Sequence, residues 1–275
     1  MTVFLHLLSI IIALLLTWYI KPRLIEILKE NNMVTTNYSG RVVVNGAGLI
    51  FFIPCILSVF SLWSLVDLDS MVAYIVLLLS MTLVGYIDDS LGTNSTKGLR
   101  GHIKGMISGN ISTGIVKLIV ALIIGVVISA VYFSSFIDII FHSILFCLCV
   151  NFINLLDLRP GRSIKGFMFF TLFISLASGL KSLWILLPIY SSLAVYIKDE
   201  MNEVYMLGDT GANLLGGVLG LYTLKAAFPG VKYSLFIILL FLHIIAEFKS
   251  FSKIIDSIPL LKYLDSFGQL GKERY

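Results

Sequence analysis

Charged residues are scarce in this chain of 275 residues, since only 13% are Asp, Glu, Lys or Arg, compared with roughly 25% in soluble domains. Hydrophobic residues make up 58% of the chain, and the mean hydropathy is +0.97. This balance excludes an ordinary soluble domain and a disordered chain. It is typical of a protein that crosses a membrane several times.

Cysteine is also rare in this chain. The three cysteines, Cys55, Cys147 and Cys149, all fall inside apolar segments. We therefore expect them to pack as small hydrophobic residues and to form neither a disulfide nor a zinc site.

Nine apolar segments predict an all-α, polytopic membrane bundle with about nine transmembrane helices. The segments cover residues 2–20, 47–66, 71–88, 113–133, 135–156, 166–179, 181–197, 211–228 and 233–247. The sixth and seventh segments are so close that they form either a tight helical hairpin or one broken helix.

Lys and Arg residues gather on one side of this predicted bundle, which places that side in the cytoplasm. The N-terminus is then outside and the C-terminus is cytoplasmic. Residues 1–247 form the transmembrane domain, and residues 248–275 form a cytoplasmic amphipathic tail. Because topology accounts for the net charge of +4, no nucleic-acid partner is expected. The predicted cytoplasmic loops are 21–46, 89–112, 157–165 and 198–210.

Four acidic residues fall at this cytoplasmic face. Asp88 and Asp89 close the third segment in TLVGYIDDSLG, Asp157 closes the fifth in NFINLLD, and Asp209 precedes the eighth in LGDTGANLLGG. A carboxylate inside a bilayer helix costs about 2.5–3.5 kcal/mol, so such residues are functional candidates. Carboxylates without histidine or cysteine partners suit Mg²⁺. Of the adjacent pair, one acid ligates while the other positions a lysine or acts as a base.

Asn151, Asn154 and Asp157 repeat every three residues and so share one stripe of a helix. We expect this stripe to face the bundle interior as part of the site. The structural alternative is that the asparagines form interhelical hydrogen bonds, worth about 0.6 kcal/mol each.

Basic residues precede and enter the fourth segment. Lys97, Arg100, His102 and Lys104 lie in one loop, and Lys117 follows one turn into the segment. Cations beside a metal site suit a diphosphate substrate, although the loop cations are equally explained as a signal of cytoplasmic location. Gly208, next to Asp209, lets the backbone approach a ligand closely; a plain helix cap is the alternative.

Together, GYIDDSLG, NFINLLD and LGDTGANLLGG resemble in order the polyprenyl-phosphate N-acetylhexosamine-1-phosphate transferases. This superfamily includes phospho-N-acetylmuramoyl-pentapeptide translocase and the transferases that start O-antigen and wall teichoic acid synthesis. The resemblance spans roughly residues 1–247, and NYSGRVVVNGAGL at 37–49 is similar to the family's first cytoplasmic loop.

The resemblance implies Mg²⁺-dependent transfer of a sugar 1-phosphate from a UDP-activated amino sugar to undecaprenyl phosphate, with release of UMP. The reaction would occur at the cytoplasmic face of the bacterial cytoplasmic membrane, in cell-envelope polysaccharide synthesis, and a homodimer is a further expectation. Asp88, Asp89 and Asp209 would be catalytic, with Asp88 and Asp209 holding the metal. The implied substrate-binding residues are Asn151, Asn154, Asp157, Lys104, Lys117 and Gly208.

Two departures keep an alternative open. Where the family has DGLDGLAGG, this chain has DLRPGRSIKGF, with Leu158 and Pro160 in place of a glycine and an acid, and residues 248–275 contain no histidine. The alternative is a non-catalytic relative that binds the lipid carrier or regulates an envelope pathway. A cation-coupled transporter would show internal repeats, which this sequence lacks. The tail, broken near Pro259, is expected to lie on the membrane surface and to cover the site.

Overall fold

The computed structural model describes residues 1–92 and 113–268, and in these residues it is almost entirely helical. Of the structure, 79% is helix. The helices that carry the predicted apolar segments are α1 (Thr2–Glu30), α2 (Phe52–Phe60), α3 (Leu68–Leu91), α5 (Thr113–Tyr132), α6 (Phe136–Leu156), α7 (Arg162–Ser178), α8 (Leu187–Met201), α9 (Gly208–Ala226) and α10 (Pro229–Phe248). Two short 3₁₀ helices, η1 (Ala47–Phe51) and η2 (Leu183–Ile185), precede α2 and α8.

Five of these helices, α1, α3, α5, α6 and α10, are long and apolar enough to cross a membrane. The prediction of an all-α membrane bundle is therefore confirmed, whereas nine spans and the orientation of the termini stay predictions. Helices α2, α7 and α8 have 9, 17 and 15 residues, which is short for the roughly 20 residues that a bilayer requires.

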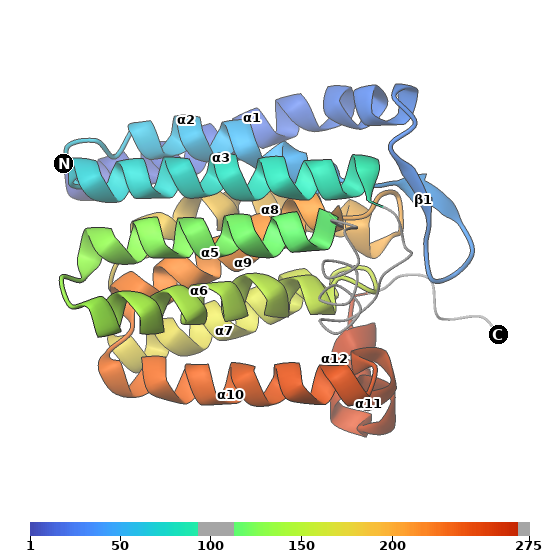
Figure 1. The fold of residues 1–275 in the computed structure, drawn as a ribbon. Coiled ribbons are helices and arrows are strands. Elements are labelled where there is room, and N and C mark those ends of the chain that lie inside the picture. Colours follow the sequence, from blue (N-terminus) through green and yellow to red (C-terminus); the bar gives the residue numbers. More distant parts are fainter. Residues whose placement is uncertain (93–112, 269–275) are drawn as a thin grey trace.

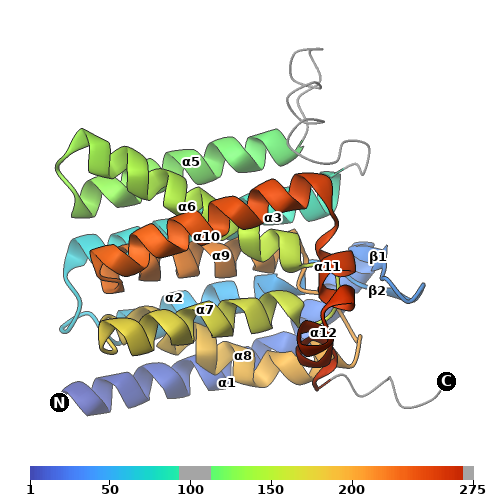
Figure 2. The same cartoon turned by 90° about the horizontal axis from the view of Figure 1, so that it is seen from below.

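The helices run back and forth along a common direction, with the N-terminus at one end and α12 (Pro259–Ser266) at the other (Figure 1). Helix α9 lies in the interior and packs against α3, α6 and α7 (Figure 2). All of its residues except Asp209 and Lys225 are buried. This burial fits a helix whose small residues allow close packing on every side.

Two glycines of α9 make close contacts with neighbouring helices. A Cβ at Gly216 would lie 2.5 Å from Val150 Cα of α6, and one at Gly217 would lie 3.0 Å from Met81 Cγ of α3. Since real Cβ contacts are rarely this short, glycine is what brings the three helices together.

Several predicted boundaries were wrong. Helix α1 continues ten residues beyond the predicted span, through Pro22 to Glu30, because the segment after the proline consists largely of strong helix formers. The rest of the predicted loop 21–46 contains strands β1 (Val34–Thr36) and β2 (Val42–Val44), which pair antiparallel with Val34 opposite Val44. The predicted loop 157–165 is shorter, since α7 already begins at Arg162.

The sixth and seventh segments form a helical hairpin. Helices α7 and α8 are joined by a turn in which Gly179, Leu180 and Ser182 have positive φ angles. Of the two arrangements that the sequence left open, the hairpin is therefore the one observed.

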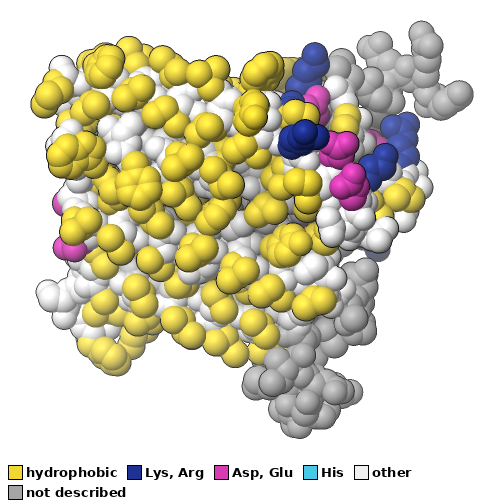
Figure 3. All heavy atoms as spheres, turned by 90° about the horizontal axis from the view of Figure 1, so that it is seen from above, with side chains coloured by type: hydrophobic (Ala, Val, Ile, Leu, Met, Phe, Trp, Pro, Cys, Tyr) yellow, Lys and Arg dark blue, Asp and Glu magenta, His cyan; other side chains and the backbone are white. Residues whose placement is uncertain are grey.

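The flank of the bundle is apolar. Figure 3 shows hydrophobic side chains over most of one face, with Lys, Arg, Asp and Glu gathered mainly at one end. Large apolar side chains such as Phe4, Leu15, Phe169 and Phe241 are more than 60% exposed. Such a surface fits a multi-pass protein embedded in a membrane.

The tail forms α11 (Phe251–Ser257) and α12, and the break between them falls at Pro259, the first residue of α12. Both short helices lie at the same end of the bundle as β1 (Figures 1 and 2). Leu260, Tyr263 and Phe267 of the tail are exposed.

Candidate active site

The four acidic residues singled out by the sequence all lie at one end of the bundle, which we call the site end. Helices α3 and α6 reach it with Asp88, Asp89 and Asp157, and α9 starts from it with Asp209. The strands and the tail helices lie at this end too (Figure 1). The structure therefore brings together three segments that are far apart in the sequence.

Lys117 bridges two of these acids. Its ammonium Nζ lies 2.8 Å from Asp88 Oδ2 and 2.9 Å from Asp209 Oδ1. The side chains of Lys117 and Asp88 are only 15% and 12% exposed, and that of Asp209 is 30% exposed. Helix α5 contributes Lys117 from its first turns, as the sequence predicted, so the lysine joins α3, α5 and α9.

Asp89 has a different environment from its neighbour. Its Oδ1 accepts hydrogen bonds from Asn45 Nδ2 (2.9 Å) and the backbone N–H of Asp209 (3.0 Å). Its Oδ2 accepts from the backbone N–H (2.8 Å) and hydroxyl (2.6 Å) of Thr210. The Asp89 carboxylate thus caps the N-terminus of α9, where unpaired N–H groups and the helix dipole favour an anion. These four hydrogen bonds favour a positioning role for Asp89 over a chemical one.

The first loop packs directly onto the segment around Asp209. The backbone N–H groups of Ala47 and Gly48 donate to the carbonyl oxygens of Met206 and Leu207, each at 3.0 Å. A Cβ on Gly48 would lie 2.1 Å from Gly211 Cα. Only two glycines can meet this closely, which explains why both segments carry glycine at these positions.

Position 208 requires a glycine, because any side chain there would clash with its neighbours. It has φ = +70°, and a Cβ there would lie 2.6 Å from both Asp89 Oδ2 and the backbone N of Gly46. Gly208 therefore lets three backbone segments approach the Asp89 carboxylate, although the contact is with protein groups and not with a ligand.

Asp157 lies near a further carboxylate that the sequence analysis did not single out. Glu200, at the end of α8, is 1% exposed, and its Oε1 accepts a hydrogen bond from the backbone N–H of Gly161 (2.8 Å). Burial raises the pKa of Glu200 to about 7. Burial, together with the nearby Glu200 and Asp209 carboxylates, raises the pKa of Asp157 well above its usual range. Glu200 falls just after a predicted span, in the predicted loop 198–210, and the surrounding sequence YIKDEM contains no pattern that marks it.

The pKa of the Asp209 carboxyl is shifted by similar effects. Burial raises the pKa of its carboxyl to about 7, and the Asp89 and Asp88 carboxylates add to the rise, while the Lys117 ammonium opposes it. Close carboxylates raise one another's pKa because two negative charges repel in a poorly solvated place.

The asparagine stripe faces the interior only in part. Asn151 is exposed, whereas Asn154 is half-buried and its Oδ1 is buried without a hydrogen-bond partner among the described residues. The interior face of α6 is otherwise apolar, since Val150 meets Gly216 and Phe146 meets Gly220 of α9. Because successive residues are about 100° apart on a helix, Asn154 and Asp157 lie close to the face of Val150, and Asn151 lies beside it.

The charge balance of the cluster suits a divalent cation. Within residues 1–92 and 113–268, Lys117 is the cation placed among the carboxylates of Asp88, Asp89 and Asp209. In this same part of the chain, no group of three His, Cys, Asp or Glu residues is arranged to hold a metal ion as it stands. The carboxylates of Asp88 and Asp209 nevertheless converge on a single cationic atom, the Nζ of Lys117. The residues present therefore fit Mg²⁺ if Lys117 moves aside.

Lys104, predicted to bind substrate, lies outside the described residues, as do Lys97, Arg100 and His102. Neither Asn45 nor the hydroxyl of Thr210 was predicted from the sequence as a site residue. Both act on the Asp89 carboxylate, and only the folded arrangement of the first loop reveals this.

Fold and site together define a multi-pass helical membrane protein with a lysine-bridged acidic cluster at one end of its bundle. In comparisons with known proteins, no family matches the chain, and no curated protein matches it significantly. The likeness to sugar-phosphate transferases consequently depends on the three sequence motifs.

Proposed function

We propose that the protein transfers a sugar 1-phosphate from a UDP-activated amino sugar to undecaprenyl phosphate, in cell-envelope polysaccharide synthesis. The site end would face the cytoplasm of a bacterium, with nine helices crossing its cytoplasmic membrane and the N-terminus outside. One observation carries the proposal: Asp88 and Asp209 share a single cation, Lys117, at the end of a membrane bundle. An acidic pair with a lysine beside it is suited to a metal-bound diphosphate.

Asp88 and Asp209 would hold Mg²⁺, which when bound neutralises charge on the oxygens of a diphosphate. Released from the two carboxylates, Lys117 would donate its hydrogen bonds to phosphate oxygens, as lysine does in other phosphate-binding sites. Asn154 would bind the sugar, as the resemblance implies, after a movement that uncovers its buried Oδ1. Asp89 would hold the start of α9, and therefore Asp209, in place.

In the transfer itself, an oxygen of the lipid phosphate attacks the phosphorus that bears the sugar. A new P–O bond forms between lipid and sugar phosphate, and the bond from that phosphorus to the oxygen of UMP breaks. UMP leaves with the electron pair. Positioning and charge neutralisation supply most of the catalysis in such reactions.

A non-catalytic relative that binds the lipid carrier is the second candidate. It is favoured by the same ion pairs, since Lys117 already holds the two carboxylates together and offsets part of their charge without a metal. A cluster held together in this way would suit a structural or regulatory protein.

The test uses purified protein in detergent with undecaprenyl phosphate, Mg²⁺ and a panel of radiolabelled UDP-sugars. We expect a lipid-linked sugar diphosphate and UMP, and both are lost with EDTA, with Asp88→Asn and with Asp209→Asn. Asp69→Asn is the matched control, because Asp69 is exposed at the other end of the same helix α3 as Asp88. No product with any donor, while Mg²⁺-dependent lipid binding persists, would establish the second candidate instead.

A further inference from the structure

The tail is attached to the bundle by a buried ion pair at the start of α7. Arg162 donates from Nε and Nη2 to the two oxygens of Asp265, at 2.9 and 2.8 Å, and from Nη1 to Ser252 Oγ at 3.0 Å. The side chains of Arg162 and Asp265 are only 4% and 5% exposed. Lys165 adds hydrogen bonds from Nζ to the carbonyl oxygens of Leu264 and Asp265. This buried contact therefore holds α12 against the start of α7.

A second arginine forms a similar pair of hydrogen bonds with an aspartate, but this pair is more exposed to solvent. Arg159 donates from Nη1 and Nη2 to the two oxygens of Asp256, at 3.1 and 2.9 Å. Here the arginine is 21% exposed and the aspartate 40% exposed. The guanidinium also lies 5.6 Å from the ring centroid of Tyr38. Ion pairs this exposed contribute little to stability, so Asp256 can leave Arg159 without loss of the fold.

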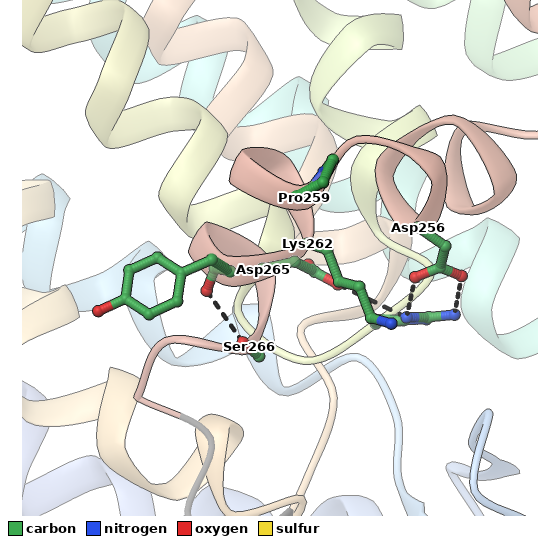
Figure 4. A pocket seen from close by; sticks show the side chains of 7 residues that line it. Asp256, Pro259, Lys262, Asp265 and Ser266 are labelled. Atoms are coloured by element: carbon green, nitrogen blue, oxygen red, sulfur yellow. Dashed lines mark hydrogen bonds and ion pairs between the residues drawn. The ribbon is translucent and has the colours of Figure 1, made fainter.

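A pocket of about 370 Å³ opens beside this exchangeable pair. Its lining includes Arg159 and, from the tail, Asp256, Pro259, Lys262, Tyr263, Asp265 and Ser266. Asp265 is a second carboxylate on Arg159, with its Oδ2 3.6 Å from Nη1, but it stays bound to Arg162. Figure 4 shows the Asp256 carboxylate meeting a guanidinium through two hydrogen bonds, with Lys262 of the neighbouring helix beside it. The volume lies within the range of about 300–1,000 Å³ found for small-molecule sites.

The chemistry of the lining identifies a ligand class. The planar fork of a guanidinium binds carboxylate and phosphate in the same two-bonded geometry. Asp256 thus occupies on Arg159 the place that a phosphate group would take. Lys262 is exposed and offers a second cation, whereas the Ser266 hydroxyl already donates to the carbonyl oxygen of Tyr263 at 2.9 Å.

We propose that this pocket binds a phosphate-bearing ligand, with Arg159 and Lys262 as its cations and Asp256 as an internal competitor that leaves when the ligand enters. The phosphate comes from a soluble nucleotide or from a lipid headgroup. The proposal is independent of the transferase function, because it concerns residues of the tail and of loop 157–161 and needs no metal.

Equilibrium dialysis of the full chain in detergent, with radiolabelled pyrophosphate and EDTA, tests the proposal. Arg159→Gln should weaken binding about tenfold, since a charge-assisted pair is lost. Asp256→Asn should tighten binding several-fold, because the competing carboxylate loses its charge. Lys262→Gln, on an exposed side chain that cannot disturb the fold, should also weaken binding. The control is Arg23→Gln, an exposed arginine of α1 paired with Glu26, which should leave binding unchanged.

Opposite effects of Arg159→Gln and Asp256→Asn support the proposal, because a purely structural ion pair would respond alike to the loss of either partner. Unchanged binding in all three pocket variants, or equal loss with Arg159→Gln and Asp256→Asn, would overturn it.

A second experiment distinguishes a soluble phosphate ligand from a lipid headgroup. The protein is placed in nanodiscs of phosphatidylcholine with or without phosphatidic acid, a lipid phosphate monoester. Displacement of pyrophosphate by phosphatidic acid, reduced in Arg159→Gln, supports the proposal with a lipid headgroup as the ligand. Retained pyrophosphate binding supports it with a soluble phosphate.

Discussion

The sharpest prediction separates the two adjacent aspartates of α3. Asp89→Asn should destabilise the protein, whereas Asp88→Asn should remove activity and leave stability almost unchanged. Asp89 accepts four hydrogen bonds from Asn45, Asp209 and Thr210. Among the described residues, Asp88 meets the ammonium of Lys117 and also hydrogen-bonds with the side chains of Thr113 and Asp209. An asparagine oxygen can accept the bond from Lys117 as well, and no backbone N–H of α9 depends on Asp88.

The expected magnitude follows from what an amide can replace. In Asp89→Asn, one oxygen becomes an NH₂ donor, and Asn45 can flip or the Thr210 hydroxyl can turn to accept from it. In either arrangement one backbone N–H, of Asp209 or of Thr210, is left without an acceptor, which costs about 1–3 kcal/mol. Loss of the negative charge at the N-terminus of α9 adds about 1 kcal/mol. The free energy of unfolding should therefore fall by about 2–4 kcal/mol.

The assay is reversible unfolding in mixed micelles with increasing SDS, followed by circular dichroism for the wild type and both variants. Asp88→Asn is the matched control, since it makes the same chemical change one residue away. Equal stability of Asp89→Asn and the wild type would refute the reasoning, because the Asp89 carboxylate would then not be needed to hold α9.

Three further predictions concern packing, pH and the tail. Gly48→Ala should lower the free energy of unfolding by about 1–3 kcal/mol or more, because its Cβ would lie 2.1 Å from Gly211 Cα. Burial raises the pKa of Glu200 from 4.5 to about 7, so the wild type should lose stability as the pH rises from about 4.5 to about 7, by about 3 kcal/mol. Glu200→Gln should remove this contribution, while the raised pKa values of Asp157 and Asp209 keep the rest of the loss, and a pH series of thermal unfolding measures both. Arg162→Gln leaves the buried Asp265 with only the longer ion pair to Arg159, at 3.6 Å. Loss of the short buried pair should cost up to about 3–5 kcal/mol, and limited proteolysis should then cut the tail faster.

Each of these predictions has its own control and contrary result. For Gly48→Ala the control is Gly230→Ala, whose Cβ would meet only the movable ring of Phe228; equal stability of the two variants would contradict the close approach. For Glu200→Gln, a variant no more stable than the wild type at pH 8 would mean that the carboxylate ionises without penalty. For Arg162→Gln the control is Arg23→Gln on exposed α1, and equal protease resistance would show that the tail is held by other contacts.

Much of the fold could be predicted from hydrophobicity alone. The apolar segments each coincide with a helix, because an apolar run in a membrane must satisfy its backbone hydrogen bonds internally. Boundaries were less predictable. Helix α1 extends beyond its apolar segment to Glu30 because helix propensity, and not hydrophobicity, decides where it ends.

The site could be predicted in its residue types and in its location at one end of the bundle. Alternation of the helices carries Asp88, Asp157 and Asp209 to the same end, and Lys117 follows from the same count. The sequence could not distinguish Asp88 from Asp89, since the two are adjacent and chemically identical. It also could not show that Asn151 is exposed, because the face of α6 that packs inward is chosen by Gly216 and Gly220 of α9.

By itself, the sequence determined that this is a helical membrane protein and that its acids gather at one end. Both follow from local properties, namely hydrophobicity and the order of segments along the chain. Only the tertiary structure decided that Asp89 caps α9, that Lys117 joins Asp88 to Asp209, and that Arg159 and Arg162 hold the tail. These contacts join segments far apart in the chain, so their partners are fixed by packing in three dimensions and leave no mark in any local pattern.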